Sequence, residues 1–384
     1  MKTIGYVLAD FPVFSETFVG NEMRAVMDHG HPVVPIIMRP GQGPAHPQDV
    51  VLADGSPKFA DVPATEALAI AGHPGRSAAR ALAFARRQTR LSRRSLLWNS
   101  AKVAAIARRH GCGHLHAHFS GGAAAHAIVA ARWLGISVSF VCHGHDVYAE
   151  PEDLPLKLRS ADAVVAVCAD MEADLRSLSV NTKLANITCG TDPGAFRPQK
   201  EVSKLPRLLF IGRLVGQKGL DDLLDAMALC KSAEVDIVGS GPLREDCERR
   251  ASELGLGDRA RFLGNQGRDW IVQEGPRYLG LVAPFKPASD GSRDSGPLVV
   301  KEAMAMGLPV IGTRFMGNKE MVAEDTGFLT PIGDPRALAA AMDRLLSLSD
   351  DERRRMGLRG RARVIERFSL AGQARSLSAL FEAA

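Results

Sequence analysis

The chain has 384 residues, of which 46% are hydrophobic and 24% are charged, and its formal net charge is +5. This length exceeds what one ordinary hydrophobic core needs and indicates two domains, while so weak a positive charge argues against a nucleic-acid-binding protein. The six cysteines are scattered without a Cys-x-x-Cys pair, which excludes the usual zinc and secreted disulfide patterns.

Short apolar runs alternate with helical patterns through the first half of the chain. Strands are predicted at 4–8, 32–38, 114–118, 137–142, 163–167 and 183–187. Ser15 is expected to cap a helix over 16–29 that stops at Gly30, and a loop rich in proline and glycine is expected over 40–63. This rhythm is typical of a parallel sheet with helices on both faces.

The rhythm restarts after the polar, proline-containing segment 193–206, which we interpret as a linker. The later strands are expected at 207–212, 235–239, 261–264, 278–283 and 309–313, and the helices at 219–230, 243–254, 298–306 and 335–346. The prediction is an α/β fold of two Rossmann-like, doubly wound domains facing a central cleft. The domains span 1–195 and 196–366, and a last helix at 367–384 is able to cross back to the first domain.

The predicted location depends on whether the chain contacts a membrane. No stretch reaches the roughly 18 apolar residues of a membrane span, so we expect a cytoplasmic protein, at most peripheral on the inner membrane. Residues 67–145 contain no Asp or Glu, and arginines from Arg76 to Arg94 alternate there with apolar side chains. Two interpretations stay open: a basic amphipathic helix that lies on an anionic membrane, or solvated arginines over a core-facing side.

The second half carries a candidate diphosphate site. A predicted strand ends in Gly212, a short loop holds Arg213 and Lys218, and a helix opens at Gly219. Two cations beside free backbone N–H groups and a helix N-terminus suit a diphosphate. The simpler alternative is a pair of surface cations around a turn.

Two carboxylates follow further along the chain. Asp294 lies in a loop and Glu302 on the next helix, and each carboxylate can accept hydrogen bonds from the vicinal hydroxyls of a sugar or ribose. The helix start also offers backbone N–H groups to a phosphate. It consists of Ser295, Gly296, Pro297 and Leu298. The alternative is a surface loop followed by an ordinary solvated glutamate.

Polar groups also end strands of the first half. The strand over 137–142 runs into His143, Gly144, His145 and Asp146, at the edge where parallel sheets bind ligands. Ser15 and Thr17 lie at the start of the first helix, a place for a phosphate or a sugar hydroxyl. Helix capping by Ser15 alone is the plainer interpretation.

Together these segments resemble the retaining glycosyltransferases of family 4, which have the GT-B fold. The matching segments are Gly212-Arg213-Leu214 with Lys218-Gly219, the turn Gly239-Ser240-Gly241-Pro242, Thr188-Cys189-Gly190-Thr191-Asp192, the pair Asp294 and Glu302, and Gly327-Phe328-Leu329. The resemblance extends over nearly the whole chain and is more specific in the second half.

The resemblance implies an activity and roles for individual residues. It implies transfer of a hexose-type sugar from a nucleoside-diphosphate sugar to a saccharide or lipid-linked acceptor, with retention and without a metal or other cofactor, in exopolysaccharide, lipopolysaccharide or glycolipid synthesis. Arg213 and Lys218 would bind the diphosphate, and Glu302 the ribose. Asp294 and His143 would contact the donor sugar. Ser15, Thr17, His145 and Asp146 would lie on the acceptor side.

Two positions depart from the family pattern. Asp294 stands where the family usually has Glu, which puts the identity of the donor in doubt more than the reaction class. Cys189 stands where the family has Asn.

Three other functions are alternatives to this one. His114, His116, His118 and His143, with His145 nearby, have the spacing of a metal cluster in a metal-dependent hydrolase. That alternative leaves Arg213 and Lys218 unexplained. A nucleotide-sugar epimerase of the same fold and a non-catalytic sugar-binding module are the other two.

Overall fold

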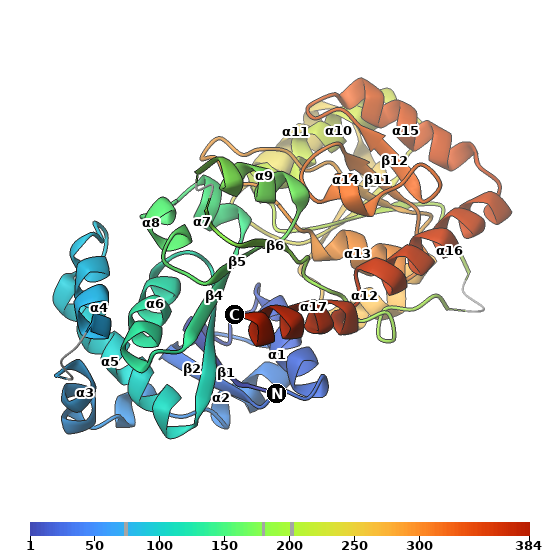
Figure 1. Ribbon diagram of the computed structural model, residues 1–384. Helices are drawn as coiled ribbons and strands as arrows, with labels where there is room; N and C mark the ends of the chain where they lie inside the picture. Colours follow the sequence, from blue (N-terminus) through green and yellow to red (C-terminus); the bar gives the residue numbers. More distant parts are fainter. Residues whose placement is uncertain (73–75, 179–180, 200–202) are drawn as a thin grey trace. The chain divides into compact units, whose positions relative to one another are not determined.

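The computed structural model describes residues 1–72, 76–178, 181–199 and 203–384 (Figure 1). The chain forms two compact units, Met1–Cys189 with Leu370–Ala384, and Gly190–Ser369. The division therefore falls at 189/190, six residues before the predicted 195/196. The C-terminal segment that belongs to the first unit begins at Leu370 rather than at the predicted 367. Within the described residues, no helix combines the length and apolar character needed to cross a membrane.

The first unit is built on a six-stranded parallel sheet in the order β2-β1-β3-β4-β5-β6. Its strands are β1 (Thr3–Phe11), β2 (Val33–Pro40), β3 (Cys112–His118), β4 (Ser137–Cys142), β5 (Ala163–Ala166) and β6 (Leu184–Asn186). Its helices are α1 (Thr17–Asp28), α2 (Pro47–Asp54), α3 (Ala64–Ala71), α4 (Arg76–Arg86), α5 (Arg93–Arg109), α6 (Gly122–Leu134), α7 (Gly144–Tyr148), α8 (Leu154–Leu158), α9 (Ala169–Leu178) and α17 (Leu370–Ala383). Successive strands are added on one side of β1 (β2) and then on the other (β3 to β6), so the strand order reverses between β1 and β3, where a ligand site is expected.

The core of the first unit lies on both faces of this sheet. The apolar side chains of β4 are buried, and the alanine-rich α6 lies close against the sheet because its small residues permit it. On the other face, α17 packs beside α1 (Figure 1). Lys2 Nζ ties α17 to the first strand, since it donates to the carbonyls of Phe381 (2.8 Å) and Ala384 (3.1 Å).

Three local predictions for the first unit were wrong. Helix α1 begins at Thr17 with Glu16 at the N-cap position, so Ser15 lies before the cap. The segment 40–63 contains α2, a helix that Pro47 opens at its first position, where a missing N–H costs nothing. The arginine-rich stretch forms two helices, α4 and α5, rather than one amphipathic face.

The second unit repeats the architecture with the sheet order β12-β11-β10-β7-β8-β9, again parallel throughout. The strands are β7 (Leu208–Ile211), β8 (Val235–Val238), β9 (Ala260–Gly264), β10 (Leu281–Ala283), β11 (Val310–Thr313) and β12 (Gly327–Thr330). The helices are α10 (Leu220–Leu229), α11 (Arg244–Glu253), α12 (Arg268–Glu274), α13 (Leu298–Ala305), α14 (Asn318–Met321), α15 (Pro335–Ser347) and α16 (Asp350–Arg367). The reversal point lies between β7 and β10, whose carboxyl ends lead into the predicted diphosphate and sugar segments. The predicted fold class of two doubly wound α/β units is confirmed.

Candidate functional site

The loop after β7 is held in its path by glycine. Gly219 has φ +64°, and a Cβ there would lie 2.0 Å from the carbonyl oxygen of Pro284, which follows β10. Only glycine accepts both the left-handed backbone and this close approach. The loop that carries Arg213 and Lys218 is thereby fixed against the neighbouring strand end, at the reversal point of the sheet.

Lys218 and Asp294 come together at this point. Their side chains form an ion pair, and Lys218 Nζ also lies 4.4 Å from the centre of the Phe285 ring. Gly212 leaves room for the lysine stem, because a Cβ there would lie 3.2 Å from Lys218 Cδ. Arg213, the other predicted phosphate ligand, is exposed. The structure therefore brings two of the predicted donor-site residues into contact.

The segment 295–298 leads into α13. Pro297 takes the N-cap position, so the first N–H groups of α13 lack acceptors within the helix. Ser295 is buried, and its carbonyl accepts from Gly317 N (3.1 Å). The carbonyl of Gly296 accepts from Lys301 Nζ (3.3 Å). These bonds fix the entry to the helix whose N-terminal dipole was predicted to face a phosphate.

Glu302 lies one turn into α13. Burial raises the pKa of its carboxyl to about 7, and the charges of Arg268 and Lys301 only partly oppose this shift. A carboxyl with this pKa changes charge near neutral pH. Such perturbed groups are frequent at ligand-binding sites.

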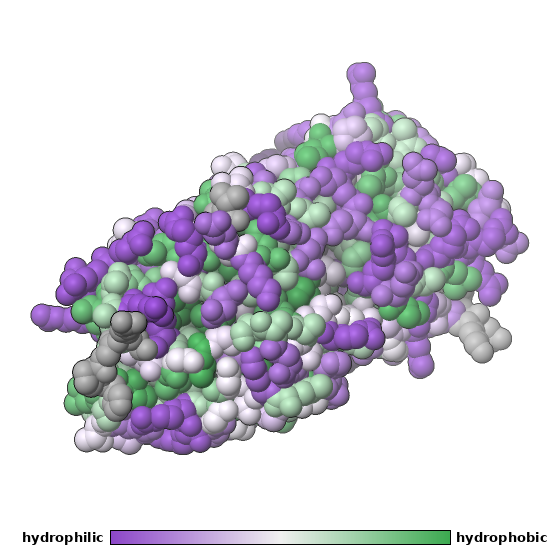
Figure 2. Space-filling view, viewed as in Figure 1, coloured by the Kyte–Doolittle hydropathy of each residue, from purple (hydrophilic) through white to green (hydrophobic). Residues whose placement is uncertain are grey.

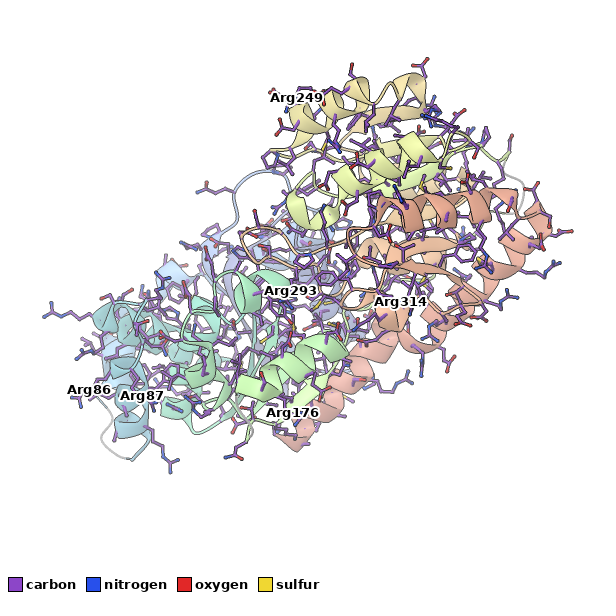
Figure 3. The ribbon with its side chains drawn as sticks, turned by 90° about the horizontal axis from the view of Figure 1, so that it is seen from above. Arg86, Arg87, Arg176, Arg249, Arg293 and Arg314 are labelled. Carbon is purple, nitrogen blue, oxygen red and sulfur yellow. The ribbon has the colours of Figure 1, made fainter. Side chains whose placement is uncertain are left out.

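A cavity of about 870 Å³ in the second unit lies beside β12 and α15. Arg314 (labelled in Figure 3), Lys319 and Phe328 are among its lining residues. Neither Lys218 nor Asp294 lines it, so it is separate from the predicted donor site.

The first unit has its own pocket, of about 690 Å³, at the carboxyl ends of β1 and β3. Its polar lining side chains are Asp10, Glu16, Arg39, Gln42, His118, His145 and Asp146. The predicted acceptor-side residues His145 and Asp146 thus share a pocket. Ser15, Thr17 and His143 are outside its lining.

Asp146 is buried and structurally engaged. Its two oxygens accept from the backbone N–H groups of Ser120 (2.6 Å) and His143 (2.8 Å). Burial raises the pKa of this carboxyl, and these hydrogen bonds oppose the rise. His145 is exposed, with Nε2 3.8 Å from Glu150. Asp146 therefore holds the pocket wall, whereas the side chain of His145 is accessible to a ligand.

The three histidines of β3 do not form the four-histidine metal cluster of the alternative hydrolase. Both ring nitrogens of His114 bond to serine hydroxyls of β4, at 2.7 Å each, and His116 Nδ1 bonds to Ser139 (2.7 Å). His114 and His116 also pack on Phe381 of α17, with ring centres 4.9 and 5.1 Å apart. The face of β3 that carries these histidines, the histidine face, is therefore mostly buried in the core of the first unit.

A buried carboxylate that the sequence analysis missed lies beside these rings. Glu22 Oε1 is 3.3 Å from His116 Nε2 and 3.1 Å from His118 Nε2, and the three ligand-type atoms fall within 4.8 Å of one another. Glu22 also accepts from Tyr6 OH (3.0 Å) and Gln373 Nε2 (2.6 Å). The sequence signal was available: Glu22 shares the α1 face of Val19, Met23 and Val26, all buried.

Two family models match the chain. The model described as Glycosyltransferase Family 4 matches residues 15–195, and the model described as Glycosyl transferases group 1 matches residues 194–363. Together they match residues 15–363, which include the loop with Lys218 as well as His145 and Asp146.

Relatives and solved structures agree with these matches. The amylovoran biosynthesis glycosyltransferase AmsK of Erwinia amylovora is 27% identical over 53% of this chain; the chain spans about half of AmsK, 54%. The putative colanic acid biosynthesis glycosyltransferase WcaL of Escherichia coli (strain K12) is 26% identical over 99% of both chains. The crystal structure of Anabaena HepE in complex with UDP superposes with a TM-score of 0.76 over 100% of both chains at 16% identity, which shows the fold alone. The chain belongs to the family 4, group 1 glycosyltransferases and has the GT-B fold.

Proposed function

We propose that this glycosyltransferase moves a hexose-type sugar from a nucleoside-diphosphate sugar to a saccharide or lipid-linked acceptor, with retention, during synthesis of a surface polysaccharide or lipopolysaccharide. The names of AmsK and WcaL support the pathway class, and the UDP bound to HepE supports a nucleotide donor. The observation that carries the proposal is the pairing of Lys218 with Asp294 at the sheet reversal of the second unit, beside the start of α13.

In this proposal the second unit binds the donor. Lys218, Arg213 and the N-terminus of α13 meet the charge of the diphosphate, so no metal is needed. Glu302 accepts the ribose hydroxyls and Asp294 those of the donor sugar, near Lys218. In the first unit, His143 contacts the donor sugar, and the pocket with His145 receives the acceptor.

The test combines binding with product analysis. Purified protein is screened by thermal shift against nucleoside diphosphates and their sugars, with and without EDTA. A shift of several degrees that survives EDTA is expected for one base, and NMR of the transfer product should show the anomeric configuration of the donor. No shift with any nucleotide would contradict the donor site. Interconversion of the donor sugar without transfer would identify an epimerase.

A peripheral membrane contact is a second part of the proposal. Arg86 and Arg87 lie at the end of α4 (labelled in Figure 3) and, like Arg90, Arg93 and Arg94, are exposed. Figure 2 shows hydrophilic and hydrophobic surface side by side in the region of α3 and α4. Phe84 and Leu96 point into the core, so the arginines carry the attraction to an anionic surface. Flotation with anionic liposomes at low salt should recover the protein; failure to float would remove this contact.

A further inference from the structure

A buried chain of side chains connects His143 to Glu22 inside the first unit. His143 Nε2 lies 3.3 Å from His118 Nδ1, and His118 Nε2 lies 3.1 Å from Glu22 Oε1. Glu22 and His118 are 1% and 2% exposed. The rings of Phe18 and Phe119 flank His143, with centres 4.8 and 4.6 Å from its own. The imidazole of His143 therefore has a defined place and defined partners.

The direction of the hydrogen bonds follows from the start of α7. His143 is the N-cap residue of this helix, and its side chain accepts from the backbone N–H of Asp146, while Asp146 accepts from His143 N (2.8 Å). Burial lowers the pKa of His143 well below its usual value, so the ring is neutral. Since Nε2 of His143 faces His118, Nδ1 is the ring nitrogen left to accept from Asp146, and a neutral imidazole whose Nδ1 accepts carries its hydrogen on Nε2.

The remaining hydrogen bonds between these side chains then all run in one direction, from His143 to Glu22. His143 Nε2–H donates to His118 Nδ1, so His118 carries its hydrogen on Nε2 and donates it to Glu22. This last bond needs an ionised acceptor. Burial alone raises the pKa of Glu22, but His118 and His116 outweigh it and hold the pKa well below the usual range.

Glu22 is itself held from two further sides. Tyr6 OH of β1 donates to Oε1 (3.0 Å), and Gln373 Nε2 of α17 donates to Oε2 (2.6 Å). Three elements distant in sequence thus fix one carboxylate, and that carboxylate fixes the order of hydrogens up to His143.

We propose that Glu22 is a positioning residue, which through His118 sets the tautomer and orientation of His143, with Gln373 holding Glu22 in place. The kinetic consequence rests on the proposed function, in which His143 contacts the donor sugar. The tautomer itself does not. With an amide at position 22, the NH₂ group can donate to His118 Nε2, which reverses the chain and puts a hydrogen on His143 Nδ1, facing the N–H of Asp146. Replacement of a carboxylate by an amide behind a histidine is known to select the wrong tautomer.

The experiment is ¹⁵N NMR of the imidazoles in the full-length protein, together with steady-state kinetics. In the wild type, the expected spectrum shows His143 with a protonated Nε2 and an unprotonated Nδ1. In Glu22→Gln we expect a second tautomer of His143 and a kcat lower by roughly 10- to 100-fold, with the acceptor KM little changed. Glu22→Asp keeps the charge and should restore the wild-type tautomer with part of the activity. Ser137→Ala, which removes a hydroxyl bonded to His114 Nδ1 on the same sheet (2.7 Å) and is bonded neither to Glu22 nor to His118, is the matched control.

Each outcome decides a separate point. A wild-type His143 protonated on Nδ1, or a Glu22→Gln protein with an unchanged tautomer and unchanged kcat, would overturn the proposal. A tautomer that depends on Glu22 in a protein without detectable transfer would support the positioning role and contradict the proposed function. If Glu22→Gln does not fold, the wild-type and Glu22→Asp spectra still decide.

Discussion

Lys218 has two competing anions: the carboxylate of Asp294, which it contacts, and the diphosphate that the proposed function assigns to it. The two side chains are 14% and 18% exposed, so water screens their attraction only in part. Any diphosphate bound by Lys218 must share or displace this carboxylate. Asp294 consequently influences donor affinity even for ligands that lack the sugar.

Asp294→Asn is therefore expected to tighten the binding of a nucleoside diphosphate by about 5-fold, the equivalent of a partly exposed ion pair of about 1 kcal/mol. Lys218→Met should weaken binding by 10-fold or more, by the order of a charge-assisted hydrogen bond. Isothermal titration calorimetry measures both. Lys286→Met, which removes a cation paired with Asp221 (2.6 Å), is the control. Equal affinities in all four proteins would place the diphosphate elsewhere.

Glu302 predicts a pH dependence of donor binding. Its pKa is raised to about 7, so the carboxylate that accepts both ribose hydroxyls is lost as the pH falls below about 7. We expect the affinity for a nucleoside to fall by up to about 10-fold per unit below that value, and Glu302→Gln to abolish the dependence. A nucleoside without phosphates avoids the titration of the ligand itself.

The raised pKa of Glu302 affects the stability of the fold in the opposite direction to donor binding. Because the folded pKa lies above the unfolded value of 4.5, the stabilising contribution of protonated Glu302 is complete below that value and is lost as the pH rises through about 7. Thermal melts at several pH values should show this loss in the wild type and not in Glu302→Gln. Parallel curves would show that burial does not perturb Glu302.

At the level of elements, the loop between β7 and α10 depends on a glycine with two separate constraints. Gly219 and Gly333 have nearly the same backbone, φ +64° and +65°, but a Cβ at Gly333 meets nothing within 4 Å. The pair separates the cost of the left-handed backbone from that of the clash with Pro284.

Gly333→Ala should destabilise the protein by about 1–2 kcal/mol, the cost of the left-handed conformation. Gly219→Ala should cost at least about 1 kcal/mol more, because the carbonyl of Pro284 must move as well. Urea denaturation measures both. Only Gly219→Ala is also expected to weaken diphosphate binding, since Lys218 precedes it in the loop.

The elements could be predicted from the sequence wherever apolar runs were bounded by turn residues. Strand β4 was predicted at its observed limits, and α10, α11 and α15 within one residue at each end. Helix α2 was missed because it opens with Pro47 and lies between prolines and glycines that are typical of a loop. The edge strand β12 was missed because it opens with Gly327 and has only two large apolar side chains, Phe328 and Leu329. The helical spacing of Glu22 indicates that it is buried, but it does not identify its partners, because they lie on β1, β3 and α17 and patterns along one helix do not encode such distant contacts.

At the level of the whole molecule, the two units differ in how they use the chain. The second unit is one continuous segment, whereas the first is completed only by Leu370–Ala384. Helix α17 covers His114 and His116 with Phe381 and holds His31 through Ser378 (2.8 Å). The first unit thus has a core that the last residues of the chain close.

Removal of residues 370–384 should destabilise the first unit selectively. We expect a lower thermal transition for that unit and binding of a hydrophobic dye to the uncovered histidine face. Nucleoside diphosphate binding should persist, because its residues lie in the second unit. Arg375→Ala, on the exposed side of α17, is the control and should behave as the wild type. Loss of diphosphate binding along with the first unit would show that the units do not fold independently.

The discontinuity of the first unit also bears on how the protein is made. A ribosome delivers residues 1–189 first, yet the helix that closes their core emerges only after the whole of 190–369. The continuous second unit can therefore reach its native state before the unit that precedes it in synthesis. During that interval the uncovered face of β1 and β3 is the part of the nascent chain most in need of a chaperone.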